Sequence, residues 1–229
     1  MQDLLSIHAP VFMDMLSEPV ADKITRAGQL VAYSDGQLIH SRGDDKPGMS
    51  IVKSGTAHIG IYGADGSFVM TSIFGAGQTF GEFTLFAGLP RTHDVTASGA
   101  THIYQISEAR FIALHTQEPE IAKALLTTTL MRTHLLLEMM DAMRRLPIRE
   151  RTAKILLAMM KMSHTNDVFV CRQSDLAFTL GVSRMSLSTA LKQLAALGLI
   201  ETGYGEIRLP DPARIANWVA DNCSGGRPA

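Results

Sequence analysis

Apolar side chains between residues 119 and 145 recur at alternating steps of four and three, the spacing of one helix face. Pro119 suits a first helical turn and Pro147 is the next break, so the pattern predicts one long helix. One apolar line holds Leu126, Leu130, Thr133, Leu137 and Met140. A second, adjacent line holds Leu125, Thr129, Arg132, Leu136, Met139 and Met143. Two lines predict that one packs on the helix's own domain and the other on a second copy of the chain. The alternative is a core helix of a monomer.

Before this helix the apolar period is two. Short helices are expected up to residue 28, followed by strands at residues 30–33, 38–40, 49–52, 58–62, 69–74, 79–80, 95–97 and 103–106. Turn sequences such as Lys53-Ser54-Gly55 and Ala64-Asp65-Gly66 separate them. Many short strands at near-regular spacing predict an antiparallel β-roll of the jelly-roll kind.

After Pro147 the pattern predicts a helix at residues 148–162, a short strand at 168–171 and then two helices joined by a tight turn. Gly181 permits that turn and Ser183 caps the second helix. A hairpin follows at residues 199–209, so this part predicts a winged helix-turn-helix. The alternative is an ordinary pair of antiparallel helices. Residues 223–229 are rich in Gly and Pro and are expected to form a disordered tail, with Cys223 as a thiol without a role.

Composition and charge narrow the class of protein. The chain has 229 residues, enough for two domains, and its two cysteines cannot form a disulfide framework. No apolar run reaches the length of a membrane span, and the first residues lack a signal peptide's pattern, so we expect a cytoplasmic protein. From Pro147 onward the chain has 10 Lys and Arg against 7 Asp and Glu, whereas the rest has 11 against 15. The excess of positive charge favours the second half as the part that meets a polyanion.

The segment 80–92 carries chemistry within the predicted β-roll. Gly81 allows a close approach of backbone N–H groups to a ligand, and Glu82 can accept from a sugar hydroxyl. Arg91, followed by the hydroxyl of Thr92, offers a fork for a phosphate. The alternative is a structural ion pair between Glu82 and Arg91 in a domain that binds no nucleotide.

This segment resembles the phosphate-binding cassette of cyclic-nucleotide-binding domains, FGE-x-x-L followed by a short loop and R-[ST]. The order of β-roll, long helix, hinge and winged helix-turn-helix resembles the CRP/FNR superfamily of transcription regulators. The resemblance implies an α+β protein with a sensor domain at 1–117, a dimerisation helix and hinge at 118–146, and a DNA-binding domain at 147–222. It also implies that Arg91 and Thr92 hold a phosphate and that Glu82 holds a ribose.

The resemblance places further pocket residues on the long helix. Arg132 matches an arginine of the family's pocket, but Leu136 and Leu137 stand where the family's best-known member reads adenine with a Thr–Ser pair. Leucine offers no hydrogen bond to a purine. We therefore expect either another ligand, such as a different cyclic nucleotide or another small anionic effector, or no ligand at all, and no metal. We also expect a dimer that is close to its active state without effector.

The predicted second helix of the helix-turn-helix presents its first turns to the major groove. We expect Arg184 to contact guanine, with Ser183, Lys192, Arg172 and Gln173 on phosphates. The DNA-facing set is Arg172, Gln173, Ser183, Arg184, Met185, Ser188, Thr189 and Lys192. Met185 and Thr189 replace the Glu and the second Arg of the family pattern, so we expect a different operator.

The sequence thus predicts a dimeric, sequence-specific DNA-binding regulator on a pseudo-palindromic operator. Double-stranded DNA, a second copy of the chain and RNA polymerase are the expected partners, with no membrane. No nucleophile–base pair or carboxylate dyad indicates catalysis. Two alternatives remain. One is a DNA-binding factor that needs no effector, and the other is a cyclic-nucleotide-binding module that acts on a protein partner.

Overall fold

The computed structural model of the protein describes residues 10–64, 66, 68–163, 168–170, 173–203 and 205–223. The chain divides into two compact units, and the division falls inside one helix. One unit comprises Pro10–Gly66 and Met70–Met131, and the other is built mainly on the chain from Arg132 onward. Each unit is described by itself.

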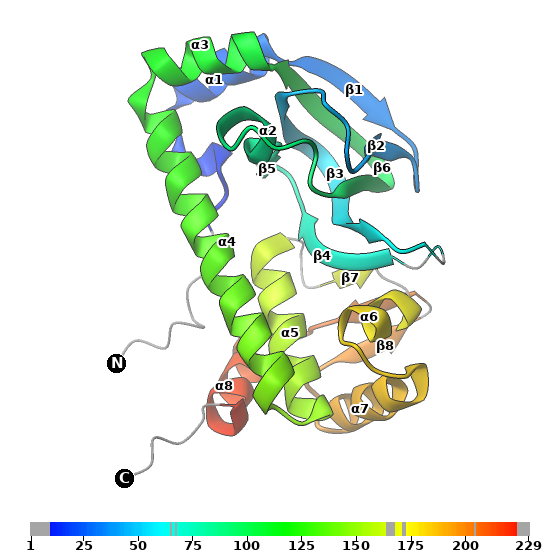
Figure 1. The fold of residues 1–229 in the computed structure, drawn as a ribbon. Helices are drawn as coiled ribbons and strands as arrows, with labels where there is room; N and C mark the ends of the chain where they lie inside the picture. Colours follow the sequence, from blue (N-terminus) through cyan, green and yellow to red (C-terminus); the bar gives the residue numbers. More distant parts are fainter. Residues whose placement is uncertain are drawn as a thin grey trace. The chain divides into compact units, whose positions relative to one another are not determined.

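The first unit is an antiparallel β-roll, as its period-two pattern predicts (Figure 1). Its main sheet has the order β1-β6-β3-β4, with β2 paired to β6 and β5 paired to β3. The strands are β1 (Gln29–Tyr33), β2 (Leu38–His40), β3 (Gly48–Tyr62), β4 (Phe68–Phe74), β5 (Thr79–Phe80) and β6 (Asp94–Ser107).

Two pairs of predicted strands are in fact single long strands. The sequence Lys53-Ser54-Gly55 is not a turn, because β3 continues through it with irregular pairing to β6. Gly55 has a φ of +81°, and an added Cβ would lie 2.5 Å from the carbonyl oxygen of Ala100. Glycine is therefore needed here for a close approach of two strands, a local requirement that looks like a turn in the sequence.

Helices cover one end of the roll. The 3₁₀ helix η2 (Met13–Met15) is followed by α1 (Glu18–Ala27), which lies beside α3 (Glu108–Gln117), while α2 (Glu82–Phe86) is a single short turn (Figure 1). These helices and the first part of α4 (Pro119–Arg145) share a core. Its buried members are Phe12, Val20, Ile24, Met49, Ile51, Ile106, Phe111, Ile121, Ala124 and Leu125.

The long helix α4 has the predicted length, but its buried face differs from the predicted second line. Leu125 and Met139 are buried as expected, whereas Thr129, Leu136 and Met143 are exposed. The buried line lies further round the helix, at Ile121, Ala124, Thr128, Leu135, Met139 and Ala142. Thr128 fits there because its hydroxyl donates to the carbonyls of Ala124 and Leu125. The sequence pattern did not predict this line, because several of its residues are small or polar and do not stand out in an apolar repeat.

The other predicted line of α4 is entirely exposed. Its members Leu126, Leu130, Thr133, Leu137 and Met140 all face outward in the single chain. Leu126 is 62% exposed and Leu137 is 59% exposed. An exposed stripe of this kind, apolar except for Thr133, marks an interaction surface.

The second unit has the predicted winged helix-turn-helix topology. Helix α5 packs against α7 and α8, and a three-stranded sheet has the order β7-β9-β8. The elements are α5 (Ile148–Ser163), β7 (Val168–Val170), α6 (Gln173–Thr179), α7 (Arg184–Ala196), β8 (Glu201–Gly203), β9 (Glu206–Arg208) and α8 (Pro212–Cys223). No helix in the described part of the chain is both long enough and apolar enough to cross a membrane.

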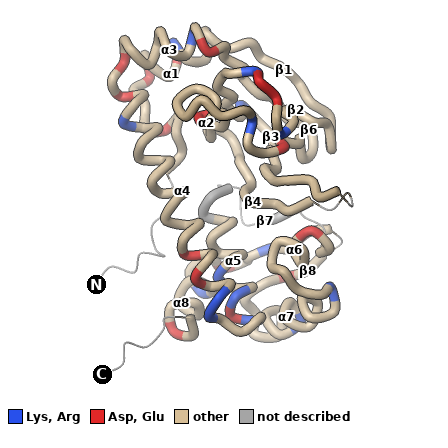
Figure 2. Tube along the Cα trace, viewed as in Figure 1, with Lys and Arg blue, Asp and Glu red and all other residues tan. Residues whose placement is uncertain are grey.

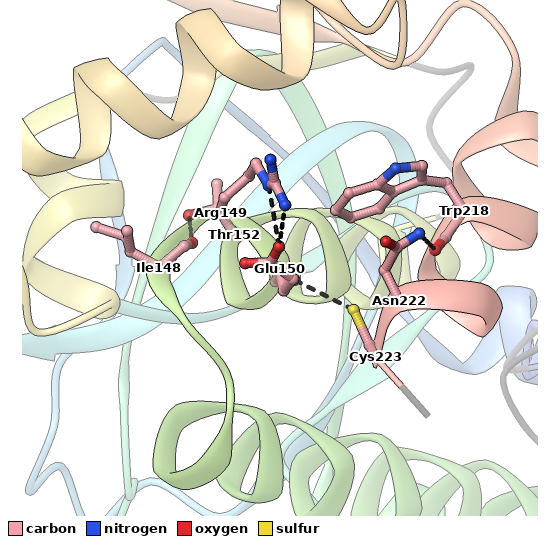
Figure 3. Close-up of polar contacts among 7 residues, drawn as sticks. All are labelled: Ile148, Arg149, Glu150, Thr152, Trp218, Asn222 and Cys223. Carbon is pink, nitrogen blue, oxygen red and sulfur yellow. Dashed lines mark hydrogen bonds and ion pairs between the residues drawn. The ribbon is translucent and has the colours of Figure 1, made fainter. Parts of the chain in front are cut away.

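The prediction for Cys223 was wrong. This residue is the last of α8 rather than the first of a tail, and it is buried. Its thiol lies 3.7 Å from the backbone oxygen of Glu150 on α5, and burial raises its pKa to about 11 (Figure 3). Ile215, Val219 and Cys223 lie at steps of four on one face of α8, which explains the burial of the thiol. The rest of the expected tail lies outside the described residues.

Candidate functional site

The turn between α6 and α7 is fixed by the backbone. Gly181 has a φ of +64°, and its N–H donates to the carbonyl of Phe178 at 2.9 Å. The N–H of Val182 donates to the carbonyl of Ala177 at 3.0 Å. These bonds close α6 and turn the chain into α7, as expected for a helix that ends on a left-handed glycine.

Ser183 caps α7, as predicted. Its Oγ accepts from the backbone N–H of Ser186 at 3.1 Å, and the two hydroxyls are 2.9 Å apart. The hydroxyl of Ser183 is thus engaged within the helix start. The inner face of α7 is closed by Leu187, Ala190, Leu191 and Leu194, all buried.

The outer face of α7 carries the predicted DNA-facing residues. Arg184, Met185, Thr189 and Lys192 are exposed and Ser188 is half-buried. Arg184 and Lys192 are the charged residues of α7, and no acid stands among them. Gln173 begins α6 and is half-buried, whereas Arg172 lies outside the described residues.

Two contacts from α8 hold this unit together. The guanidinium of Arg214 donates to the carbonyl of Leu197 at 2.8 Å, which places a cation at the C-terminal end of α7. Trp218 lies against the guanidinium of Arg149 at 5.6 Å, and Arg149 in turn donates to the carboxylate of Glu150 (Figure 3). Trp218 is therefore a packing residue between α8 and α5.

A buried cation joins α5 to the second half of α4. The side chain of Lys154 is 6% exposed, and its Nζ lies 2.9 Å from Glu138 and 3.9 Å from Asp141. Figure 2 shows acidic positions along this half of α4 near basic positions of α5. Sequence reasoning missed this group, although a lysine inside the apolar run Ala153-Lys154-Ile155-Leu156 was a signal.

The cassette of the first unit is built on close packing at Gly81. This residue has a φ of +114° and precedes α2. An added Cβ would lie 2.3 Å from the carbonyl oxygen of Gly48 and 2.5 Å from Nη1 of Arg91. The absence of a side chain at position 81 is what lets Arg91 lie against this loop.

Arg91 is 7% exposed, and its Nε and Nη1 atoms have no hydrogen-bond partner among the described residues. Burial lowers the pKa of Arg91, while the carboxylates of Asp44 and Glu82 oppose that shift. A buried guanidinium with unmade hydrogen bonds is costly unless an acceptor arrives. The residue therefore has the geometry of an anion ligand whose acceptor is external.

The other cassette residues have partners of their own. Glu82 accepts from the hydroxyl of Thr79 at 2.9 Å, and the hydroxyl of Thr92 lies 2.8 Å from Nδ1 of His93. His40, which the sequence did not single out, stands in the field of Arg91 and bonds through Nε2 to the hydroxyl of Ser50 at 2.8 Å. Burial, with a smaller effect from the charge of Arg91, lowers the pKa of His40 to about 4.

The three predicted pocket residues of α4 belong to the other unit. Arg132 is half-buried, and Leu136 and Leu137 are exposed. The division of the chain falls just before Arg132, so the complete predicted pocket draws on both units. That composite pocket stays a prediction.

Two family models match the two halves of the chain. A cyclic nucleotide-binding domain matches residues 30–118, and a Crp-like helix-turn-helix domain matches residues 150–218. The Cyclic AMP receptor protein of Thermus thermophilus is 26% identical over 210 residues, which cover 90% of this chain and 95% of the relative. The CRP-like cAMP-activated global transcriptional regulator of Mycobacterium tuberculosis is 24% identical over 220 residues, covering 93% and 98%.

Solved structures share the fold. FixK2 from Bradyrhizobium japonicum superposes with a TM-score of 0.68 at 20% identity, covering 83% of this chain and 96% of FixK2. TTHA1359, a CRP/FNR-family regulator from Thermus thermophilus, gives 0.64 at 18% identity, covering 85% of this chain and 100% of that chain.

The chain is therefore a two-domain protein that joins a domain of the cyclic nucleotide-binding type, a class that takes small-molecule effectors, to a helix-turn-helix. It belongs to the CRP/FNR superfamily and is a DNA-binding transcription regulator of that type. The family consists of transcription regulators rather than enzymes. The predicted family, fold class and DNA-binding function are thus confirmed.

Proposed function

We propose that the protein acts as a cytoplasmic, non-catalytic homodimer that places one α7 of each protomer in successive major grooves of a pseudo-palindromic operator. The observation that carries this proposal is the outer face of α7, which is exposed and has two cations and no acid, behind a closed apolar inner face. Arg184 is assigned to guanine. Lys192, Gln173 and Arg172 are assigned to phosphates, and the other α7 residues face bases or backbone.

The exposed stripe of α4 supports the dimer. Leu126, Leu130, Thr133, Leu137 and Met140 repeat with heptad spacing, and two such stripes can cover one another in a pair of α4 helices. The family is one whose members act as dimers, which adds to this argument.

The cassette supports an anionic effector. Two buried nitrogen atoms of Arg91, Nε and Nη1, have no hydrogen-bond partner in the described part of the chain, which suits a phosphate. The relatives named for cyclic AMP do not settle the ligand here, because Leu136 and Leu137 offer no hydrogen bond to adenine. We assign the site to a small anionic effector other than cyclic AMP. The full site would combine Gly81, Glu82, Arg91, Thr92, Arg132, Leu136 and Leu137.

The first experiment is selection from genome fragments with the purified protein, with and without cyclic AMP and cyclic GMP. We expect enrichment of palindromic fragments without nucleotide, because Leu137 on the exposed stripe favours a closed dimer. Enrichment only with a nucleotide would favour control by that nucleotide. No enrichment would leave the module acting on a protein partner. RNA polymerase, the remaining expected partner, is tested by transcription from an enriched fragment.

Two variants test the dimer. Leu130→Glu places charge on the stripe and is expected to give a monomer that no longer binds operator, as measured by sedimentation and by band shift. Ala109→Glu places the same charge on an exposed residue of α3 and serves as its control. Leu137→Ser is expected to weaken binding of the apo protein to DNA. Equal or tighter binding by this variant would count against an effector-free active state.

A further inference from the structure

The DNA-facing surface of α7 contains an apolar residue at its most exposed point. Met185 is 82% exposed, the highest exposure among the large hydrophobic side chains of the described residues. It is the second residue of α7, in the turn that enters a major groove first. A flexible thioether is well suited to fit against an irregular apolar surface there.

Thr189 adds a second apolar group beside it. Its hydroxyl donates to the carbonyl of Met185 at 3.0 Å, so the hydroxyl hydrogen is used within the helix. Its methyl group is left as the side chain's other outward group. Residues four apart lie on one helix face, and Met185 and Thr189 therefore present methyl groups side by side.

The polar and charged side chains of this surface flank the pair of Met185 and Thr189. Ser183 and Ser186 bond to one another at the start of the helix. Arg184 precedes Met185, and Lys192 lies one turn beyond Thr189. The centre of the outer face is thus apolar, with a cation on either side along the helix.

One apolar group stands on base edges in the major groove, and it is the 5-methyl group of thymine. We propose that Met185 and Thr189 read thymine through this methyl group, so that each half-site carries thymine at the base pairs opposite them. The inference rests on the proposed docking of α7 in the groove and names the base chemistry that this docking selects.

The test uses DNA that lacks only the methyl group. An operator is first selected from random duplexes with the wild-type protein, and each thymine of one half-site is then replaced singly by deoxyuridine. We expect binding to weaken about fourfold for each methyl group that is lost at one or two positions, and to stay unchanged elsewhere. At those same positions, 5-methylcytosine should bind more tightly than cytosine.

Matched variants assign the effect to the two side chains. Met185→Ala and Thr189→Ser each remove a methyl-bearing group from an exposed position, and we expect the thymine-to-uracil ratio to fall toward one at the position each faces. Lys192→Ala should weaken binding to both duplexes equally.

The outcomes distinguish the thymine inference from the proposed DNA-binding function. Equal affinity for thymine and uracil at every position would overturn the thymine inference while leaving DNA binding intact. So would a ratio that persists in both Met185→Ala and Thr189→Ser. Failure to select any DNA would overturn the proposed function, and the inference with it.

Discussion

Arg91 shows how a single buried side chain can indicate a ligand. Its Nε and Nη1 atoms have no hydrogen-bond partner among the described residues, and the carboxylates of Asp44 and Glu82 oppose only part of the effect of burial. A tightly packed glycine, Gly81, holds it against the loop. The motif made Gly81 and Arg91 predictable from the sequence. Asp44 and His40 were not predictable, because they come from a loop and strand about fifty residues earlier that only the folded sheet brings close.

Replacing Arg91 by Met should therefore stabilise the protein when no ligand is present. We expect the unfolding free energy of the first unit to rise by about 1 kcal/mol, because the unmade hydrogen bonds disappear. Stabilisation by added inorganic phosphate or a nucleotide should be lost. Calorimetry on the full chain measures both effects, with the exposed Arg42→Met as control. A clearly less stable Arg91→Met protein would indicate a structural ion pair instead.

His40 makes stability depend on pH. Its pKa is about 4 in the folded protein because burial disfavours the charged ring, whereas an unfolded histidine titrates near 6.5. Protonation thus favours the unfolded chain, and stability is lost as pH falls below about 6.5 toward 4. From pH 7 to pH 5 this amounts to roughly 1–2 kcal/mol. His40→Gln should reduce the loss in denaturant unfolding at the two pH values. An identical loss in the variant would exclude His40 as its source.

At the scale of elements, the sequence predicted the existence of helices better than it predicted which of their faces are buried or where strands end. The length of α4 follows from Pro119 and Pro147, and the helix-turn-helix follows from Gly181 and Ser183. The buried face of α4 did not follow, because Ala and Thr carry much of it. The strands β3 and β6 were each divided in two, because each contains an interior glycine with positive φ, Gly55 and Gly99, which resembles a turn in the sequence.

The ion pairs of Lys154 with Glu138 and Asp141 should contribute to the stability of the second unit. Glu138→Gln removes the nearer carboxylate, at 2.9 Å, and leaves a buried ammonium with Asp141 at 3.9 Å. We expect a loss of about 3 kcal/mol, the usual cost of breaking a buried pair. Trp218 is the chain's one tryptophan, so its fluorescence during urea unfolding reports on this unit.

The double variant Glu138→Gln with Lys154→Met is the control for that loss. Removing both charges should restore most of the stability, because an apolar side chain needs no partner in the buried position. If the double variant is no more stable than Glu138→Gln, the loss does not come from the unpaired ammonium.

At the scale of the whole molecule, the proposed homodimer needs two copies of α7 about 34 Å apart, one helical turn of DNA. Each protomer then contributes the same phosphate contacts, so every change in the chain counts twice in the complex. Salt dependence measures this doubling directly, because each neutralised phosphate releases counterions.

Log affinity falls with log salt, and Lys192→Ala should make this negative slope less steep by about 2, since each of the two lost contacts contributes about 0.9. Titrations of a selected operator between about 50 and 200 mM salt provide the measurement. Lys123→Ala on α4 should leave the slope unchanged. A decrease close to 1 would point to one bound α7, and no decrease would remove Lys192 from the phosphate contacts.

The boundary between the two units falls inside α4. Insertions or deletions of residues in this helix are therefore expected to be poorly tolerated. A helix advances 100° per residue, so one residue inserted between Met131 and Arg132 would turn everything beyond it by that angle. Leu126 and Leu130 would then point away from Leu137 and Met140, and the outward stripe would be split. Loops elsewhere can lengthen without this penalty. Replacement of one domain by another during evolution would therefore have to preserve the rotational phase of α4 at the junction.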